Sequence, residues 1–235
     1  MKSIEKIAGK NHITKRLYED NAFRTVFITY ISFSINIIYA AAYGVNGILK
    51  SSPWLGTFSA YYIFLSLMRI IVLRADLKVR RGAHRSSKER FIWRRYLAVG
   101  LLLFSSAAIF TGFTIILISG EGGKHYAGYF IYMMCIYTFY KCISAVRNLF
   151  KARKADDPVV SMLRHISQAD ALLSVLSLQT AMFASFADPA EDTAAFITTM
   201  NGVTGGLVCI IILFLGTTMT IRAIKKLQGI RKVQA

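Results

Sequence analysis

The sequence predicts an all-α, polytopic membrane protein with six transmembrane helices, and two observations carry this prediction. Long apolar runs cover 26–48, 55–73, 96–119, 126–146, 171–187 and 196–221. Each run is close to the ~20 residues that a helix needs to cross ~30 Å of hydrocarbon. The 29 Lys and Arg residues are also unevenly placed, because only Lys50 and Lys124 lie in the segments after the first, third and fifth runs. By the positive-inside rule, both termini are then cytoplasmic.

The charge pattern also divides the chain into three parts. We expect a basic cytoplasmic arm at 1–25, a six-helix transmembrane domain at 26–222 and a basic cytoplasmic tail at 223–235. The arm is either a helix lying on the cytoplasmic leaflet or a solvated segment. The net charge of +17 belongs to the cytoplasmic segments, where Lys and Arg orient the helices and attract anionic lipid headgroups. No nucleic-acid-binding motif accompanies this charge, so we expect no nucleic-acid partner.

The two halves of the chain show a weak internal similarity. In and beside the first and fourth runs, Tyr and Asn recur at a spacing of 102 residues. A Phe-Ile pair stands at 91–92, just before the third run, and at 196–197, where the sixth run begins, and each pair has a Gly nine residues after its Phe. Three spans in each half is an odd number, so a true repeat would be inverted, with two three-helix units related by an axis in the membrane plane. The alternative is chance similarity between apolar helices.

Three uncharged polar residues fall near the middle of predicted spans. They are Asn36 in the first, Thr138 in the fourth and Gln179 in the fifth. Polar groups deep in a bilayer are costly, and inverted-repeat transporters bind their substrates at this depth. These residues are therefore candidate ligand-binding residues. Hydrogen bonding between helices explains them equally well.

Two cations lie within predicted spans, Arg69 in the second and Lys141 in the fourth. The hydropathy pattern places no carboxylate at a comparable depth, since Asp170 falls at the cytoplasmic edge of the fifth span. One interpretation is that an anionic ligand completes a site formed by the two cations, together with Tyr62, Tyr137 or Tyr140. A second is that both side chains extend to lipid phosphates, and a third is an ion pair with Asp170.

The sequence contains no enzyme signature and predicts no cofactor or metal site. The four His residues lie outside the apolar runs without metal-binding spacing, and no phosphate-binding loop or nucleophile motif occurs. We therefore expect a small membrane transporter or channel, for an anionic solute if Arg69 and Lys141 form a site. The alternative is a non-catalytic membrane subunit or scaffold that binds anionic lipid or a partner protein. The oligomeric state stays open.

Several short segments together suggest a family resemblance. They are Ser-Pro-Trp-Leu-Gly-Thr at 52–57, Tyr-Tyr-Ile-Phe-Leu-Ser-Leu-Met-Arg at 61–69, Ile-Tyr-Thr-Phe-Tyr at 136–140 and Leu-Gln-Thr-Ala-Met at 178–182. Over about 50–226 the chain resembles a group of small six-span membrane proteins of Gram-positive anaerobic bacteria. The resemblance implies an integral protein of a bacterial plasma membrane, and it implies no catalytic or binding residue.

The predicted topology can be tested by cysteine accessibility in a background without the native cysteines. A cysteine at Glu121 or Glu191 should react with an impermeant thiol reagent added outside the cell. A cysteine at Ser86 or Asp157 should react only after the membrane is opened, because these segments are expected to be cytoplasmic. Reversed reactivity at any of the four positions contradicts the topology.

Overall fold

The chain is helical throughout the part that the structure describes. This computed structural model describes residues 21–49, 51, 53–80, 85–118, 128–151, 157–186 and 191–234. Within these ranges it forms six helices: α3 (Asn21–Leu49), α4 (Pro53–Arg80), α5 (Arg85–Ile118), α6 (Gly128–Lys151), α7 (Pro158–Phe186) and α8 (Glu191–Gln234). The all-α prediction is therefore confirmed. Most of the expected N-terminal arm lies outside the described residues.

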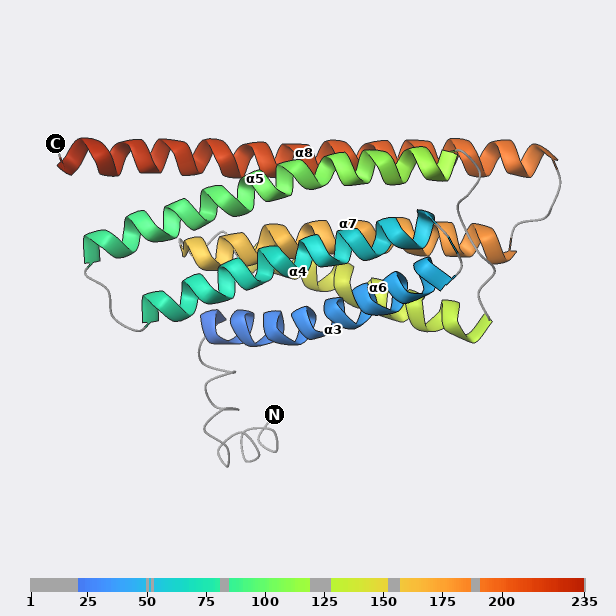
Figure 1. Cartoon of the computed structure of the whole chain (residues 1–235), viewed down its shortest axis with the longest axis horizontal. Coiled ribbons are helices and arrows are strands. Elements are labelled where there is room, and N and C mark those ends of the chain that lie inside the picture. Colours follow the sequence, from blue (N-terminus) through green and yellow to red (C-terminus); the bar gives the residue numbers. More distant parts are fainter. Residues whose placement is uncertain are drawn as a thin grey trace, which may run out of the picture.

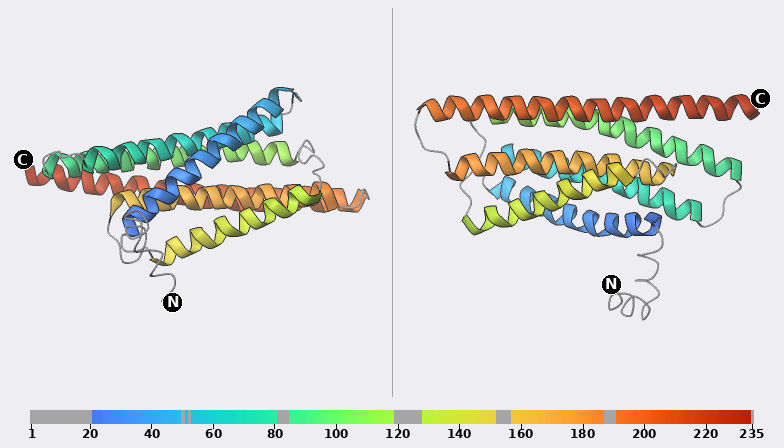
Figure 2. Two further views of the ribbon diagram at one scale, coloured as in Figure 1. Left: turned by 90° about the horizontal axis from the view of Figure 1, so that it is seen from below. Right: turned by 180° about the vertical axis from the view of Figure 1, so that it is seen from behind.

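The six helices are arranged in three layers of two (Figure 1). Helices α5 and α8 form one outer layer, α4 and α7 lie in the middle, and α3 and α6 form the other outer layer (Figures 1 and 2). The closest packing is between α5 and α8, followed by α3 with α4 and α6 with α7. The middle layer therefore connects the two outer layers.

Proline residues fix the starts of the two central helices. Pro53 opens α4 and Pro158 opens α7, a position at which the missing N–H of proline leaves no hydrogen bond unmade. Asp157 caps α7, because its Oδ1 atom accepts a hydrogen bond of 2.8 Å from the backbone N–H of Val159. Asp157 thus lies at a helix start, and Asp156 lies outside the described residues.

Four helices are long and apolar enough to cross a membrane, judged by length and composition. The candidate spans are Phe27–Leu49 in α3, Gly56–Val79 in α4, Lys88–Gly112 in α5 and Thr193–Lys232 in α8. The chain thus has the features of a multi-pass membrane protein. Helices α6 and α7 do not reach the same apolar average within the described residues, so the prediction of six spans is supported for four helices only.

Burial divides the helices into a central and a peripheral set. In the apolar window of α4, 56% of residues are buried, compared with 17% in α3. Large apolar side chains are exposed on the outer helices, among them Ile38 (67%), Ile136 (67%) and Phe214 (66%). A surface of this kind would be unfavourable in water, but it would be favourable in contact with the hydrocarbon of a membrane.

The basic segments of the sequence meet at one end of the bundle. The end of α4, the starts of α5 and α7 and the end of α8 all lie towards the left of Figure 1. Each of these helix ends carries Lys or Arg residues. Helix α8 continues to Gln234 without a break, so the expected tail at 223–235 extends the last helix over nearly its whole length.

Helices α5 and α8 approach each other closely at glycine residues. A Cβ atom on Gly216 would lie 2.7 Å from the backbone N of Phe104, and one on Gly205 would lie 2.5 Å from Oγ1 of Thr114. Gly100 packs in the same way against Thr220. Small residues allow this close approach, which gains dispersion energy where the hydrophobic effect between helices is weak.

We predict that Gly216→Ala destabilises the protein by about 1–3 kcal/mol, because the added methyl group would overlap the backbone of Phe104. Gly206→Ala is the matched control, since a Cβ atom there meets nothing within 4 Å. Thermal unfolding of both variants in detergent checks this. Equal melting temperatures would contradict the packing described.

Candidate functional site

A buried carboxylate joins three helices near the centre of the bundle. The Oδ2 atom of Asp170 in α7 lies 2.7 Å from Nη2 of Arg69 in α4. Its Oδ1 atom lies 2.8 Å from Nζ of Lys141 in α6. Arg69 is 2% exposed and Asp170 3% exposed, and the side chain of Lys141 is 9% exposed. We call these three residues the ion triad.

Hydroxyl groups on the same helices complete the hydrogen bonding of Lys141. Its ammonium group donates to Oγ of Ser174 at 3.0 Å, and Ser174 donates to the backbone carbonyl of Asp170 at 2.9 Å. Thr138, one turn before Lys141 on α6, donates to the carbonyl of Ser174 at 3.4 Å. The candidate residue Thr138 therefore links α6 to α7 beside the ion triad.

Aromatic rings form one wall of the site. The Tyr137 and Tyr62 rings lie under the Lys141 ammonium, with centroids 4.5 and 5.7 Å away. Tyr39 of α3 stacks against both rings, at centroid distances of 5.9 and 5.5 Å. Ring faces attract cations, so this wall adds to the stabilisation of Lys141. Tyr140 is 59% exposed and lies on the outer side of α6.

The expectation that no carboxylate lies as deep as the two cations is wrong. Helix α7 begins at Pro158, so Asp170 lies well inside it, and the drop in hydropathy before position 171 does not mark a helix end. The structure shows the third interpretation, an ion pair with Asp170. Both cations are buried against this residue, so neither extends to lipid phosphates.

One nitrogen of the ion triad and some other buried polar groups of α3 and α4 have no hydrogen-bond partner among the described residues. One carboxylate faces two cations, so the three side chains carry one net positive charge. Within the described residues, Nη1 of Arg69, both amide atoms of Asn36 and Oγ of Ser66 are buried and unpaired. Ser66 precedes Arg69 by three residues and so shares its face of α4. Unpaired buried groups are rare and indicate an unseen partner.

A second polar contact joins α7 to α8. Nε2 of Gln179 donates to Oδ1 of Asn201 at 3.2 Å, and Asn201 is only 4% exposed. Sequence reasoning selected Gln179 and missed Asn201. The signal was present, because Asn201 is an amide within the apolar run at 196–221. Of the three uncharged candidates, Thr138 and Gln179 thus form interhelical bonds, and Asn36 does not pair with a described residue.

Comparison with known proteins does not assign the chain to a family. No protein-family model matches the chain, and no curated protein matches it significantly. Among the described residues, no cluster of three His, Cys, Asp or Glu residues could hold a metal ion. The chemistry of the candidate site therefore follows from its charges and hydrogen bonds.

We predict that Asp170→Asn is strongly destabilising, by about 3–5 kcal/mol, because it leaves two buried cations without a counter-charge. Lys141→Met should cost much less, since Arg69 keeps its partner. Denaturant unfolding in detergent measures both, with the exposed Lys225→Met as a control for loss of a charged side chain. If Asp170→Asn and Lys141→Met lowered the free energy of unfolding by similar amounts, the charge balance described here would be contradicted.

Proposed function

We propose that the protein is a small transporter of a bacterial plasma membrane that carries a monovalent anion past the ion triad. The observation that carries this proposal is the net positive charge of Arg69, Lys141 and Asp170, with one buried Arg69 nitrogen left unpaired. A buried excess charge is unfavourable unless it is compensated. An anion of charge −1 would compensate it.

The unpaired groups on α3 and α4 are suited to such a ligand. The Arg69 guanidinium can donate from Nη1 while Nη2 remains on Asp170. Asn36 and Ser66 supply further donors that lack a described partner. A carboxylate or a halide could accept these bonds, because arginine donors are arranged to match planar oxyanions and also bind simple anions.

Transport requires that α6 and α7 also cross the membrane. Helix α6 has 24 residues and α7 has 29, which at 1.5 Å per residue gives about 36 and 44 Å, enough to span the hydrocarbon layer. Their lower apolar average comes from polar residues such as Lys141, Asp170 and Gln179. The charged groups of Lys141 and Asp170 are paired with each other, and the Gln179 amide is paired with Asn201.

The layered arrangement supports an inverted repeat of α3–α5 and α6–α8. Each layer combines one helix from each half, and α3 packs on α4 as α6 packs on α7. The glycine contacts correspond as well: Gly100 meets Thr220, and Gly205 meets Thr114. The ion triad joins α4 of one half to α6 and α7 of the other. Inverted-repeat transporters bind their substrates between the halves.

The proposal predicts that liposomes containing the protein take up a monovalent anion faster than protein-free liposomes. Chloride, acetate, lactate and inorganic phosphate are the probes, at constant ionic strength. A transported anion should also raise the melting temperature, because ligands stabilise the native state that binds them. Lys141→Met removes the excess charge and should abolish both effects, whereas the exposed Lys225→Met should not.

Lys141→Arg keeps the charge and should retain uptake. Uptake equal to that of protein-free liposomes for all four anions would contradict the proposal. Unchanged uptake by Lys141→Met would also contradict it.

A non-catalytic membrane subunit or scaffold is the second candidate, favoured by the gathering of basic residues at one end of the bundle. Such a surface attracts anionic lipid or an acidic partner protein. This function would need no passage between the halves. The uptake experiment therefore separates the two candidates.

A further inference from the structure

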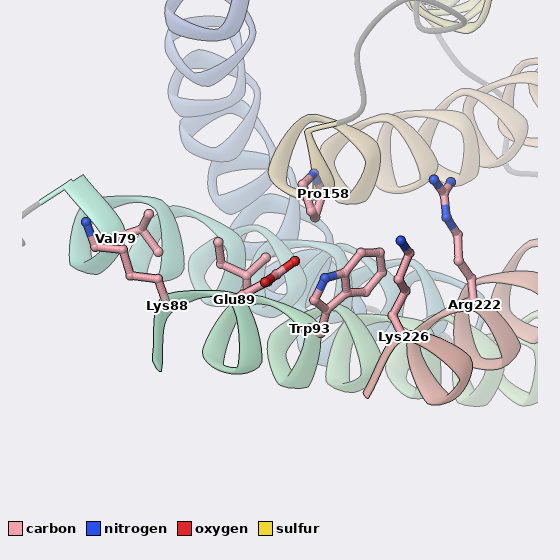
Figure 3. Close-up of a pocket in the computed structure, with 8 residues that line it drawn as sticks. Val79, Lys88, Glu89, Trp93, Pro158, Arg222 and Lys226 are labelled. Carbon is pink, nitrogen blue, oxygen red and sulfur yellow. The ribbon is translucent and has the colours of Figure 1, made fainter. Parts of the chain in front are cut away.

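A cavity opens at the basic end of the bundle, away from the ion triad. It has a volume of about 450 Å³ and lies where the end of α4, the first turns of α5, the start of α7 and the last part of α8 meet (Figure 3). This volume is within the range of about 300–1,000 Å³ that small-molecule sites occupy. Ligand binding in this cavity would not require the proposed transport function.

The lining of the cavity combines three cations with one carboxylate and four apolar residues. Lys88 comes from α5, and Arg222 and Lys226 come from α8, one turn apart. In Figure 3 the Arg222 side chain extends towards α7 and the Lys226 ammonium lies beside the Trp93 ring, at 6.0 Å from the ring centroid. With Glu89, these side chains give the cavity a net charge of +2. Arginine can hold a phosphate with two parallel hydrogen bonds, and lysine adds charge.

A further cation at this end of the bundle is Arg164. Arg164 on α7 and Arg222 on α8 are close enough to repel each other. Within the described residues, Nη2 of Arg164 is buried without a hydrogen-bond partner.

The position of the cavity suits the headgroup region of a bilayer. The candidate span of α5 begins at Lys88, and Trp93 is 6% exposed within its first turns. Tryptophan is enriched where hydrocarbon meets the headgroups, and basic residues at that level attract anionic lipid. The phosphate of a membrane lipid would therefore lie at the same depth in the bilayer as the cavity.

Glu89 restricts the kind of phosphate that fits. Its carboxylate lies on the opposite side of Trp93 from Lys226 (Figure 3). It would repel a doubly charged phosphate monoester and would accept a hydrogen bond from a hydroxyl group. A phosphodiester with a terminal hydroxyl satisfies both requirements.

We propose that this cavity binds the glycerophosphate headgroup of an anionic phospholipid, with the phosphate on Arg222 and Lys226 and the headgroup hydroxyl on Glu89, while Lys88 lines the far side of the cavity beside Val79 (Figure 3). The lipid therefore occupies a defined site between α5, α7 and α8. The site lies at the end of the bundle that the charge pattern assigns to the cytoplasm.

Native mass spectrometry of the detergent-purified protein, supplied with one lipid at a time, tests this proposal. Phosphatidylglycerol should be retained at least about tenfold better than phosphatidylcholine. The variant Lys88→Gln/Lys226→Gln should lose this preference. The matched control Lys225→Gln/Lys232→Gln removes the same charge from α8 outside the cavity and should keep the preference. Melting temperatures of both variants verify folding.

Two further binding measurements identify the chemical class of the ligand. Phosphatidic acid should bind less well than phosphatidylglycerol to the wild type, and Glu89→Gln should remove that difference. Soluble glycerol 3-phosphate should not displace the lipid, and displacement would show that a soluble phosphate compound is the ligand. The proposal is overturned if phosphatidylcholine binds as well as phosphatidylglycerol, or if the folded Lys88→Gln/Lys226→Gln variant retains phosphatidylglycerol like the wild type.

Discussion

The electrostatic balance around Asp170 is the constraint on which the centre of this bundle depends. Removing an ion from water costs several kcal/mol in a protein interior, and the cost falls only when partners are held in good geometry. Both oxygens of Asp170 are used, one for Arg69 and one for Lys141. Helices α4, α6 and α7 must therefore keep one relative register. Apolar residues could fill the same space at similar stability, so three buried charges are more readily explained by function than by folding.

The two outer layers are attached to this centre by different physical means. Helix α8 packs along α5 through glycine contacts with Thr114 and with the backbone of Phe104, a tight association that needs no charge. Helix α3 meets α4 through stacked aromatic rings and through a 2.8 Å hydrogen bond from Ser59 to the carbonyl of Ala40. The ion triad lies on the side of the less buried layer.

Basic residues gather in one region of the fold. By the positive-inside rule, Lys and Arg near the helix ends would orient the helices in the membrane. The fold brings those ends together, and a cavity lined by Arg222, Lys226 and Lys88 results. The residues from which the orientation is predicted thus also line the cavity for which we propose a phospholipid ligand.

The sequence alone determined the helical class, the approximate positions of the helices and the gathering of basic segments at one end. These follow from apolar length and charge, which act locally and need no knowledge of neighbours. It also selected Arg69 and Lys141, because a cation within an apolar run is costly wherever the helix packs. It could not place Asp170, since a polar stretch at the start of α7 resembles a loop until the partners from α4 and α6 are known. The pairing of Gln179 with Asn201 and the layering of the six helices likewise arise from side-chain contacts between distant segments, which only the tertiary structure decides.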